Sequence, residues 1–182
     1  MARTSTCGRK EWVTAAAQAL AAGGWDRVKV EPLAKSLGVT KGSFYWHFKN
    51  RRELLDAVVQ TWAKMGTLGV IEHVDAQSED PRVRLQILWA KTDADRNDVE
   101  IAIRNLAEHD APTAQVVQRV DEQRFAYLRK NFRALGCTPA DAEARGMLMY
   151  SLLLGDHFLS EAHGRFSRQA VLKRSIAFLL ET

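Results

Sequence analysis

The ten residues from Thr40 to Lys49 are rich in hydrogen-bond donors and contain no acid. Hydroxyl, ammonium and imidazole groups bind phosphate oxygens, and an indole ring offers an apolar face that suits a thymine methyl group. Lysines that bind phosphate release counterions, so such a surface should bind DNA less tightly as the salt concentration rises. The segment therefore predicts a surface that contacts nucleic acid. Its candidate contact residues are Thr40, Lys41, Gly42, Ser43, Tyr45, Trp46, His47 and Lys49.

The residues just before this surface have the spacing of a short amphipathic helix. Leu33, Ala34 and Leu37 fall at i, i+1 and i+4, which gives the helix one apolar face. Gly38 can take the left-handed conformation that ends a helix, and Thr40 is a good N-cap for the next one. Two helices joined by a three-residue turn that contains Gly form a helix-turn-helix.

Two phenylalanines should hold the second helix of this motif against a core. Phe44 and Phe48 are four residues apart, so they lie on one face of a helix. We expect this face to point inward. The candidate contact residues then occupy the outer surface.

The string GVTKGSFYWHFK, from Gly38 to Lys49, resembles the DNA-binding domain of the tetracycline-repressor (TetR) family of bacterial transcriptional regulators. The resemblance continues through the NRRELL that follows and extends back to Trp12. It implies an N-terminal three-helix DNA-binding domain followed by an all-helical domain for effector binding and dimerisation. It also implies a homodimer that leaves double-stranded operator DNA when a small molecule binds.

The same resemblance divides the contact residues into two groups. The implied phosphate contacts are Thr40, Lys41, Tyr45, His47 and Lys49. The residues implied to lie nearest the base edges are Gly42, Ser43 and Trp46. A small residue lets the helix N-terminus approach the groove, which agrees with this division.

The start of the first helix of the motif departs from the family pattern. Family members commonly carry Ser or Thr there, whereas Lys29, Val30 and Glu31 occupy the stretch in this chain. A carboxylate at Glu31 would repel phosphate if it faced the DNA backbone. Lys29 could replace one of the missing contacts electrostatically.

Positive charge is concentrated at the start of the chain. Residues 1–52 hold ten Lys and Arg against three Asp and Glu, residues 53–182 hold sixteen against nineteen, and the whole chain carries +4. A local excess of this kind is the electrostatic footprint of a nucleic-acid-binding domain. With the resemblance, it predicts a helix-turn-helix DNA-binding domain over 1–52 and an all-helical effector-binding and dimerisation domain over 53–182.

Capping residues mark several of the later helices. Asn50 and Glu53 resemble a capping box for a helix that runs toward His73, and this helix is expected to couple the two domains. Thr138 and Ser167 should begin the last two large helices. Apolar residues recur at helical spacing and no strand-like alternation occurs, so the expected fold class is all-α.

The last two large helices are unusually apolar. The stretch from Met147 to Leu159 is apolar almost all the way round. Such surfaces suit an intermolecular four-helix bundle, although burial in the chain's own core would give the same pattern. The resemblance places the homodimer interface in these helices, at about 138–163 and 167–181.

A pocket for a small-molecule effector is expected between the helices from Trp62 to Leu159, since such pockets combine aromatic walls with a few polar groups. Core packing is the ordinary alternative for aromatic residues and Met at helical spacing. Arg104 could anchor an acidic ligand, or pair with Glu100 or Glu108 one turn away. The candidate lining residues are Trp62, Met65, Trp89, Arg104, Phe125, Tyr150 and Phe158.

Catalytic and metal sites are not predicted. Cys137 has no His nearby in the sequence, and no Gly-rich phosphate loop, nucleophile elbow or zincin helix occurs. His157 and Glu161 have the i, i+4 spacing of metal ligands, but a third ligand is missing. We therefore expect no enzymatic activity, no metal and no cofactor.

Two cysteines make no disulfide framework, and no run reaches the ~18 apolar residues of a membrane span. We expect a bacterial cytoplasmic protein without a membrane partner, associated with the nucleoid when it binds DNA. The predicted function is a ligand-responsive regulator, most simply a repressor released from a palindromic operator by its effector. The alternative is a helical ligand-binding dimer whose N-terminal domain docks protein rather than DNA.

Overall fold

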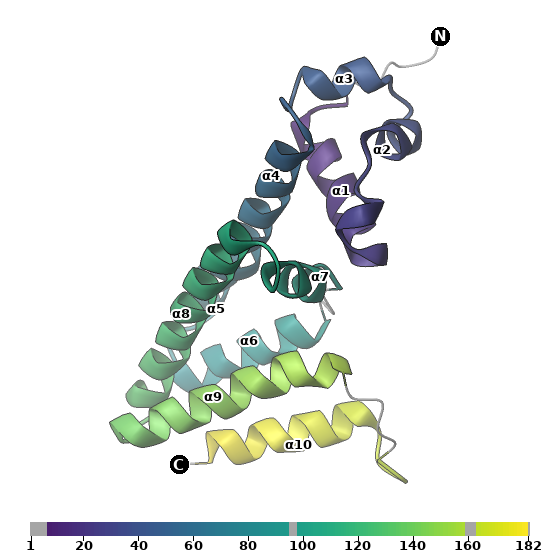
Figure 1. Ribbon diagram of the computed structural model, residues 1–182. Coiled ribbons are helices and arrows are strands. Elements are labelled where there is room, and N and C mark those ends of the chain that lie inside the picture. The colour runs from purple at the N-terminus through teal and green to yellow at the C-terminus, as the bar shows by residue number, and fades with distance from the viewer. Residues whose placement is uncertain (1–6, 95–97, 159–162, 182) are drawn as a thin grey trace. The chain divides into compact units, whose positions relative to one another are not determined.

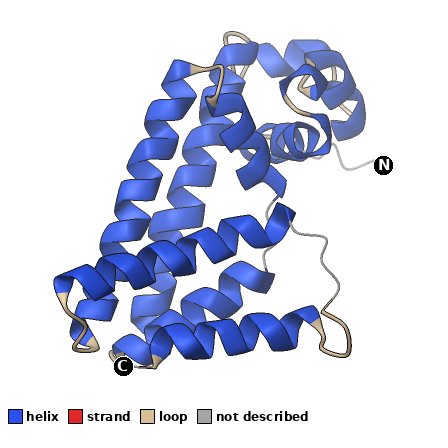
Figure 2. Cartoon of the chain, turned by 60° about the horizontal axis from the view of Figure 1, so that its bottom comes forward, coloured by secondary structure: helices blue, strands red, loops and turns tan. Residues whose placement is uncertain are grey.

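The computed structural model describes residues 7–94, 98–158 and 163–181 (Figures 1 and 2). Within these ranges every regular element is a helix, which confirms the all-α prediction. None of the helices in these ranges has both the length and the apolar content needed to cross a membrane.

The chain divides into two compact units. The first comprises Met1–Gly66 and Asn97–Val120, and the second Thr67–Arg96 and Asp121–Thr182. The first unit extends beyond the expected boundary at residue 52, because two later helices share its core. A functional boundary at residue 52 stays a prediction.

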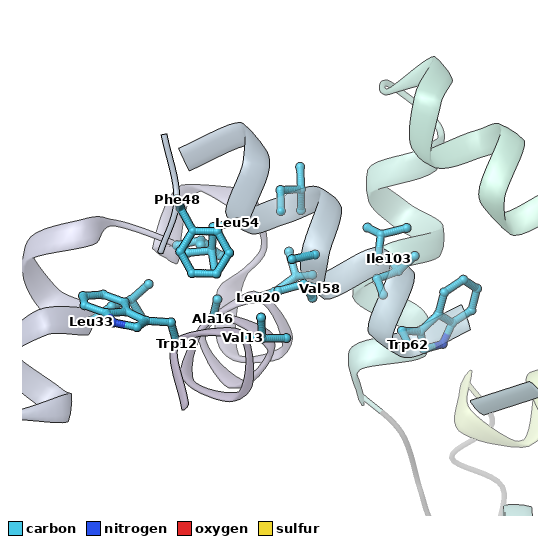
Figure 3. Packing of buried hydrophobic residues seen from close by; sticks show 14 of the residues in the cluster. Trp12, Val13, Ala16, Leu20, Leu33, Phe48, Leu54, Val58, Trp62 and Ile103 are labelled. Atoms are coloured by element: carbon cyan, nitrogen blue, oxygen red, sulfur yellow. The ribbon is translucent and has the colours of Figure 1, made fainter. Parts of the chain in front are cut away.

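The first unit has its core around α1, whose buried residues recur at i, i+4 and i+8. Trp12, Ala16 and Leu20 lie on this face and are fully buried. Val58 from α4 and Ile103 from α7 pack against them (Figure 3). Burying each of the larger aliphatic side chains stabilises the unit by roughly 1.5–3 kcal/mol. Its helices are α1 (Arg9–Gly23), α2 (Val30–Leu37), α3 (Lys41–Tyr45), α4 (Arg51–Ala63), α7 (Asp98–Ala107) and the first part of α8 (Ala111–Ala134), with a 3₁₀ turn at Trp25–Arg27.

A cluster of charges joins α4 to the start of α8 within the first unit. The Arg52 guanidinium binds both carboxylate oxygens of Asp110, the longer contact being 3.1 Å, and its Nε donates to Asp56 at 2.8 Å. Asp110 also accepts from the backbone N–H of Thr113 at 2.9 Å and from its hydroxyl at 2.5 Å. The hydrogen bonds from Arg52 and then those from Thr113 lower the pKa of Asp110 to about 2.

The helix expected from Asn50 toward His73 is not one regular α-helix. The α-helical part ends at Ala63, a π-helical turn covers Lys64–Leu68, and α5 (Gly69–Gln77) follows. Gly66 and Gly69 explain the interruption, because glycine has a low helix propensity and tolerates a local change of backbone geometry. Isolated π-helical turns occur frequently at functional sites.

The second unit has a core to which α6, α8, α9 and α10 contribute. Leu85 from α6, Leu128 and Phe132 from α8, and Met149 from α9 are fully buried, with Ile176 from α10 beside them. In Figure 1, α9 and α10 lie side by side. The unit contains α5, α6 (Pro81–Ala94), the rest of α8, α9 (Pro139–Gly155), a 3₁₀ turn at Asp156–Phe158, and α10 (Arg168–Leu180).

The predicted starts of α9 and α10 are confirmed. Thr138 accepts from the backbone N–H of Asp141 at 3.1 Å, and Ser167 accepts from that of Ala170 at 3.2 Å. The helix was expected to run to about His163, but α9 ends at Gly155 and a 3₁₀ turn covers Asp156–Phe158. Residues 159–162 lie outside the described residues. Glycine weakens helices, which accounts for the change at this point.

Candidate nucleic-acid interface

The turn between α2 and α3 has the geometry predicted for a helix-turn-helix. Gly38 has φ 68° and ψ 28°, which is the left-handed conformation. Its N–H donates to Lys35 O at 3.2 Å, and Val39 N–H donates to Ala34 O at 3.0 Å. This pair of hydrogen bonds satisfies carbonyls at the end of α2 and turns the chain toward α3.

Thr40 begins α3 as its N-cap. Its hydroxyl oxygen accepts from the backbone N–H of Ser43 at 3.4 Å. The cap satisfies one of the donors that a helix N-terminus leaves unpaired. It thereby places Lys41, Gly42 and Ser43 in the first turn of the helix.

Two buried aromatic residues hold α3 and the turn after it against the core, as predicted. Phe44 and Phe48 are buried, with ring centroids 5.5 Å apart in a stacked arrangement. Trp12 from α1 packs edge-on against Phe44 at 5.3 Å. These contacts hold the short helix in place and leave its remaining side chains outside.

The residues expected to contact DNA share the exposed side of this motif. Ser43 and His47 are half-buried, and all the others are exposed. Trp46 is 87% exposed and Tyr45 57%, which is unusual for such large rings. The structure thus brings together Thr40, Lys41, Gly42, Ser43, Tyr45, Trp46, His47 and Lys49 on and just after α3. Their contacts with DNA stay a prediction.

His47 has a structural contact that the sequence did not predict. Its Nε2 lies 3.1 Å from the carbonyl oxygen of Cys7, just before α1. At this distance the imidazole can donate a hydrogen bond to the carbonyl. One nitrogen of the ring therefore holds the segment before α1 against the turn that follows α3.

Glu31 has a specific partner. Its Oε1 lies 2.7 Å from the ammonium nitrogen of Lys41, and both side chains are exposed. The hydrogen bond and then the charge of Lys41 lower the pKa of Glu31, and the same interactions raise the pKa of Lys41. Lys29 occupies the N-cap of α2, where its side chain makes no capping hydrogen bond. The residue is exposed.

The start of α4 supports the far end of the motif. Asn50 accepts from the backbone N–H of Glu53 at 3.0 Å, which confirms it as the N-cap. Glu53 accepts from the backbone N–H of Lys49 at 2.8 Å, one residue before the position that a capping box requires. This bond fixes the backbone of Lys49.

Two arginines not predicted for this region pack on aromatic rings. The guanidinium carbon of Arg51 lies 3.7 Å from the centroid of the Trp25 ring. The guanidinium carbon of Arg9 lies 4.8 Å from the centroid of the Phe48 ring. Such cation–π contacts position the charges beside the motif. Each pair is far apart in the sequence, so periodicity carries no signal for it.

The residues predicted for an effector pocket lie in both units. Trp62, Met65 and Arg104 belong to the first, and Trp89, Phe125, Tyr150 and Phe158 to the second. Trp62 is buried and donates its indole N–H to Glu100 at 3.0 Å, and Arg104 pairs with Glu100 at 2.8 Å. Met65 and Phe158 are exposed. The ion pair of Arg104 with Glu100 is the alternative to binding an acidic ligand that the i, i+4 spacing indicated.

A polar cluster surrounds Tyr150 in the second unit. The Tyr150 hydroxyl donates to Asp121 at 2.6 Å, and Arg124 donates to that hydroxyl and to the buried Thr67, both at 3.1 Å. Phe125 packs edge-on against the Tyr150 ring at 4.9 Å. The structure thus joins two predicted pocket residues to three that were not predicted. An effector pocket here stays a prediction.

In the part of the chain that the structure describes, no group of three or more His, Cys, Asp or Glu residues could hold a metal ion. The side chain of His157 and the whole of Glu161 lie outside the described residues. The expectations of no enzymatic activity and no cofactor stay predictions.

Residues 13–58 match the sequence model of the bacterial regulatory proteins of the tetR family. The matched segment contains α2, the Gly38 turn, α3 and the first half of α4. This N-terminal segment of the chain therefore has the sequence pattern of the bacterial regulatory proteins of the tetR family. The resemblance of the string from Gly38 to Lys49 is thereby confirmed.

Several solved structures have the same fold over nearly the whole chain. AibR, solved in complex with isovaleryl coenzyme A and operator DNA, is 16% identical with a TM-score of 0.70, over 94% of this chain and 97% of that one. The ketosteroid transcriptional regulator KstR2 of Mycobacterium tuberculosis is 18% identical with a TM-score of 0.63, over 94% and 92%. A TetR/AcrR-family regulator from Thermobifida fusca YX-ER1 is 19% identical with a TM-score of 0.64, over 95% and 96%. At these identities the likeness establishes the fold.

Proposed function

We propose that this tetR-family protein is a repressor that binds a palindromic operator as a homodimer and is released by a small-molecule effector. The outer surface of α3 carries this proposal. Tyr45 and Trp46 are exposed, whereas Phe44 and Phe48, on either side of them in the sequence, are buried in the core. Large apolar area left exposed beside cations is typical of a surface that a partner covers.

The proposed contacts follow the two groups of residues on this surface. Lys41 and Lys49 supply charge to phosphates, together with Thr40, Tyr45 and His47, and Lys29 adds charge at the start of α2. Gly42, Ser43 and Trp46 approach the base edges, where the indole can pack against a thymine methyl group. The phosphate contacts give affinity that depends on salt, and the base contacts give sequence preference.

The proposed dimer forms through α9 and α10. Met147 and Leu148 on α9 and Phe178 on α10 are all more than half exposed. Pairing these faces in two copies would bury apolar area in a four-helix bundle. A symmetric dimer presents two recognition helices to half-sites about one DNA turn, or ~34 Å, apart.

Effector control is supported by one relative of the same fold. AibR was solved with both isovaleryl coenzyme A and operator DNA. In this chain we place the effector beside Phe125 and Tyr150, where aromatic walls meet polar groups. The effector favours a conformer whose recognition helices no longer match the half-site spacing, and operator affinity falls.

Selection of bound sequences from a random duplex pool tests the proposal. The expected result is a site with two symmetric halves, bound with an affinity that falls steeply as salt rises. Failure to enrich any sequence, together with binding to random duplex that is absent or insensitive to salt, would contradict it. That outcome would favour an N-terminal domain that docks protein.

A further inference from the structure

The contact between Glu31 and Lys41 places an acid on the surface proposed to face DNA. Glu31 lies in the first turn of α2 and Lys41 is the first residue of α3, so the pair spans the two helices of the motif. The Nζ to Oε1 distance is 2.7 Å, and the side chains are 54% and 72% exposed for Lys41 and Glu31. An ion pair this exposed contributes little to the stability of the fold.

Its effect on DNA binding is larger than its effect on folding. A phosphate that binds Lys41 must share or displace a carboxylate already within hydrogen-bond distance of the ammonium group. The carboxylate also repels the phosphate directly. Each phosphate contact that is lost removes one released counterion from the binding equilibrium.

We propose that Glu31 is a positioning residue that competes with phosphate for the Lys41 ammonium group and so weakens binding to every DNA duplex. The inference rests on the DNA-binding role proposed above. The base contacts of Ser43 and Trp46 are untouched by this pair. Weaker sequence-independent binding leaves more of the protein free to find its operator, because non-specific sites compete for it throughout a genome.

Binding of the full-length Glu31→Gln variant to random duplex and to the selected operator, over a series of salt concentrations, tests this role. The variant should bind both duplexes roughly two- to fivefold more tightly at low salt, the range that corresponds to an exposed ion pair. The slope of log affinity against log salt should steepen, by at most about 0.9 per protomer, because Lys41 then binds phosphate without competition.

Glu72→Gln is the matched control. Glu72 is also exposed, but it lies on α5 in the second unit, outside the DNA-binding motif and outside the helices of the proposed dimer. The substitution changes the net charge by the same amount, but it removes no acid from the surface proposed to face DNA. It should therefore leave both the affinity and the salt slope near those of the wild type. Equal effects of the two substitutions would mean that only net charge matters, and would overturn the proposal.

A double-mutant cycle with Lys41→Gln shows whether Glu31 acts through Lys41. In the Lys41→Gln background, Glu31→Gln should have little effect on affinity or slope. An undiminished effect would show direct repulsion alone and would overturn the proposal. A selective loss of operator binding in Glu31→Gln would also overturn it, since that is the signature of a carboxylate that reads cytosine.

An NMR titration of the Glu31 carboxyl group tests the pair without DNA. Its pKa should be below the ordinary glutamate value in the wild type and should rise in Lys41→Gln. An unchanged pKa means that the pair does not form, and overturns the inference alone. A wild-type protein that binds no duplex at any salt overturns the proposed function as well, whereas a wild type that binds DNA just as Glu31→Gln does overturns only the role of Glu31.

Discussion

Neighbouring aromatic residues of α3 and of the turn that follows it have opposite environments. Phe44 and Phe48 are buried against α1, whereas Trp46 lies between them in the sequence and is almost wholly in water. Helical spacing directs the first two to one face and the indole to the other. This separation allows one short segment both to join the core and to present the surface that we propose contacts DNA.

Substitutions of Trp46 and Lys49 should separate sequence reading from phosphate binding. Trp46→Ala should change the sequence recovered by selection, because an apolar contact to a base edge contributes to sequence preference. Lys49→Ala should instead keep the recovered sequence and reduce the salt slope by about 0.9 per protomer, because one phosphate contact is lost. Both are measured by selection and by titration of the selected duplex at several salt concentrations. Identical profiles for the two variants would refute the division of contacts.

The turn between α2 and α3 depends on a backbone conformation that few residues adopt. Gly38 has positive φ, and its hydrogen bonds with those of Val39 end α2. A side chain at this position meets no neighbouring atom, so the cost of substitution is conformational rather than steric crowding by other residues.

Gly38→Ala should therefore destabilise the protein by about 1 kcal/mol in urea denaturation. Gly38→Asn is the control, since Asn tolerates the left-handed region better than other side chains and should cost less. If Ala were tolerated as well as Asn, the left-handed conformation would not be what this position requires.

The link from α4 to α8 should give the protein a pH-dependent stability. The pKa of Asp110 is lowered to about 2, so the folded chain favours the ionised carboxylate. Its contribution is complete above the unfolded pKa of about 3.9 and is lost as the pH falls through about 2. Asp110→Asn should lower the free energy of unfolding by about 1 kcal/mol at neutral pH, because Arg52 is partly exposed and solvent weakens the pair. The difference should vanish near pH 2 in urea denaturation.

Asp56→Asn is the matched control for this effect. Asp56 pairs with the same arginine at 2.8 Å, one turn along α4, and is half exposed. Its loss should cost about 0.5 kcal/mol or less, as for other exposed i, i+4 pairs. A larger loss in Asp56→Asn than in Asp110→Asn would show that the link to α8 adds nothing.

The exposed apolar surface of α9 and α10 bears on the oligomeric state of the whole molecule. Met147, Leu148 and Phe178 are exposed although the opposite faces of these helices form the core of the second unit. Two apolar faces on one helix indicate two partners. The core takes one, and a second copy of the chain is the proposed other.

Leu148→Glu should therefore convert the dimer into a monomer, because a charge buried in an apolar interface lacks a partner. Sedimentation equilibrium would show the halved mass, and operator affinity should fall together with it. Glu72→Gln, an exposed substitution on α5 and so outside these two helices, should leave the mass unchanged. A dimeric Leu148→Glu variant would place the interface elsewhere.

Local patterns were enough to predict the class of fold and the form of the DNA-binding motif. Thr40 caps α3 by accepting a hydrogen bond from the residue three positions later, and Gly38 ends α2. Phe44 and Phe48, four residues apart, are both buried. All of these interactions span at most five residues. Composition and periodicity therefore carry them, and so does the family motif.

Interactions between distant segments were not accessible in this way. Glu31 pairs with Lys41 on the next helix, Arg52 reaches Asp110, and Arg124 joins Tyr150 to a different helix. A charge on a helix surface can find its partner on any neighbouring element, and periodicity says nothing about which element that is. Only the packing of the helices brings these groups within hydrogen-bond distance. From the sequence, Glu31 was expected only to repel phosphate, whereas in the structure it pairs with Lys41, a predicted DNA contact.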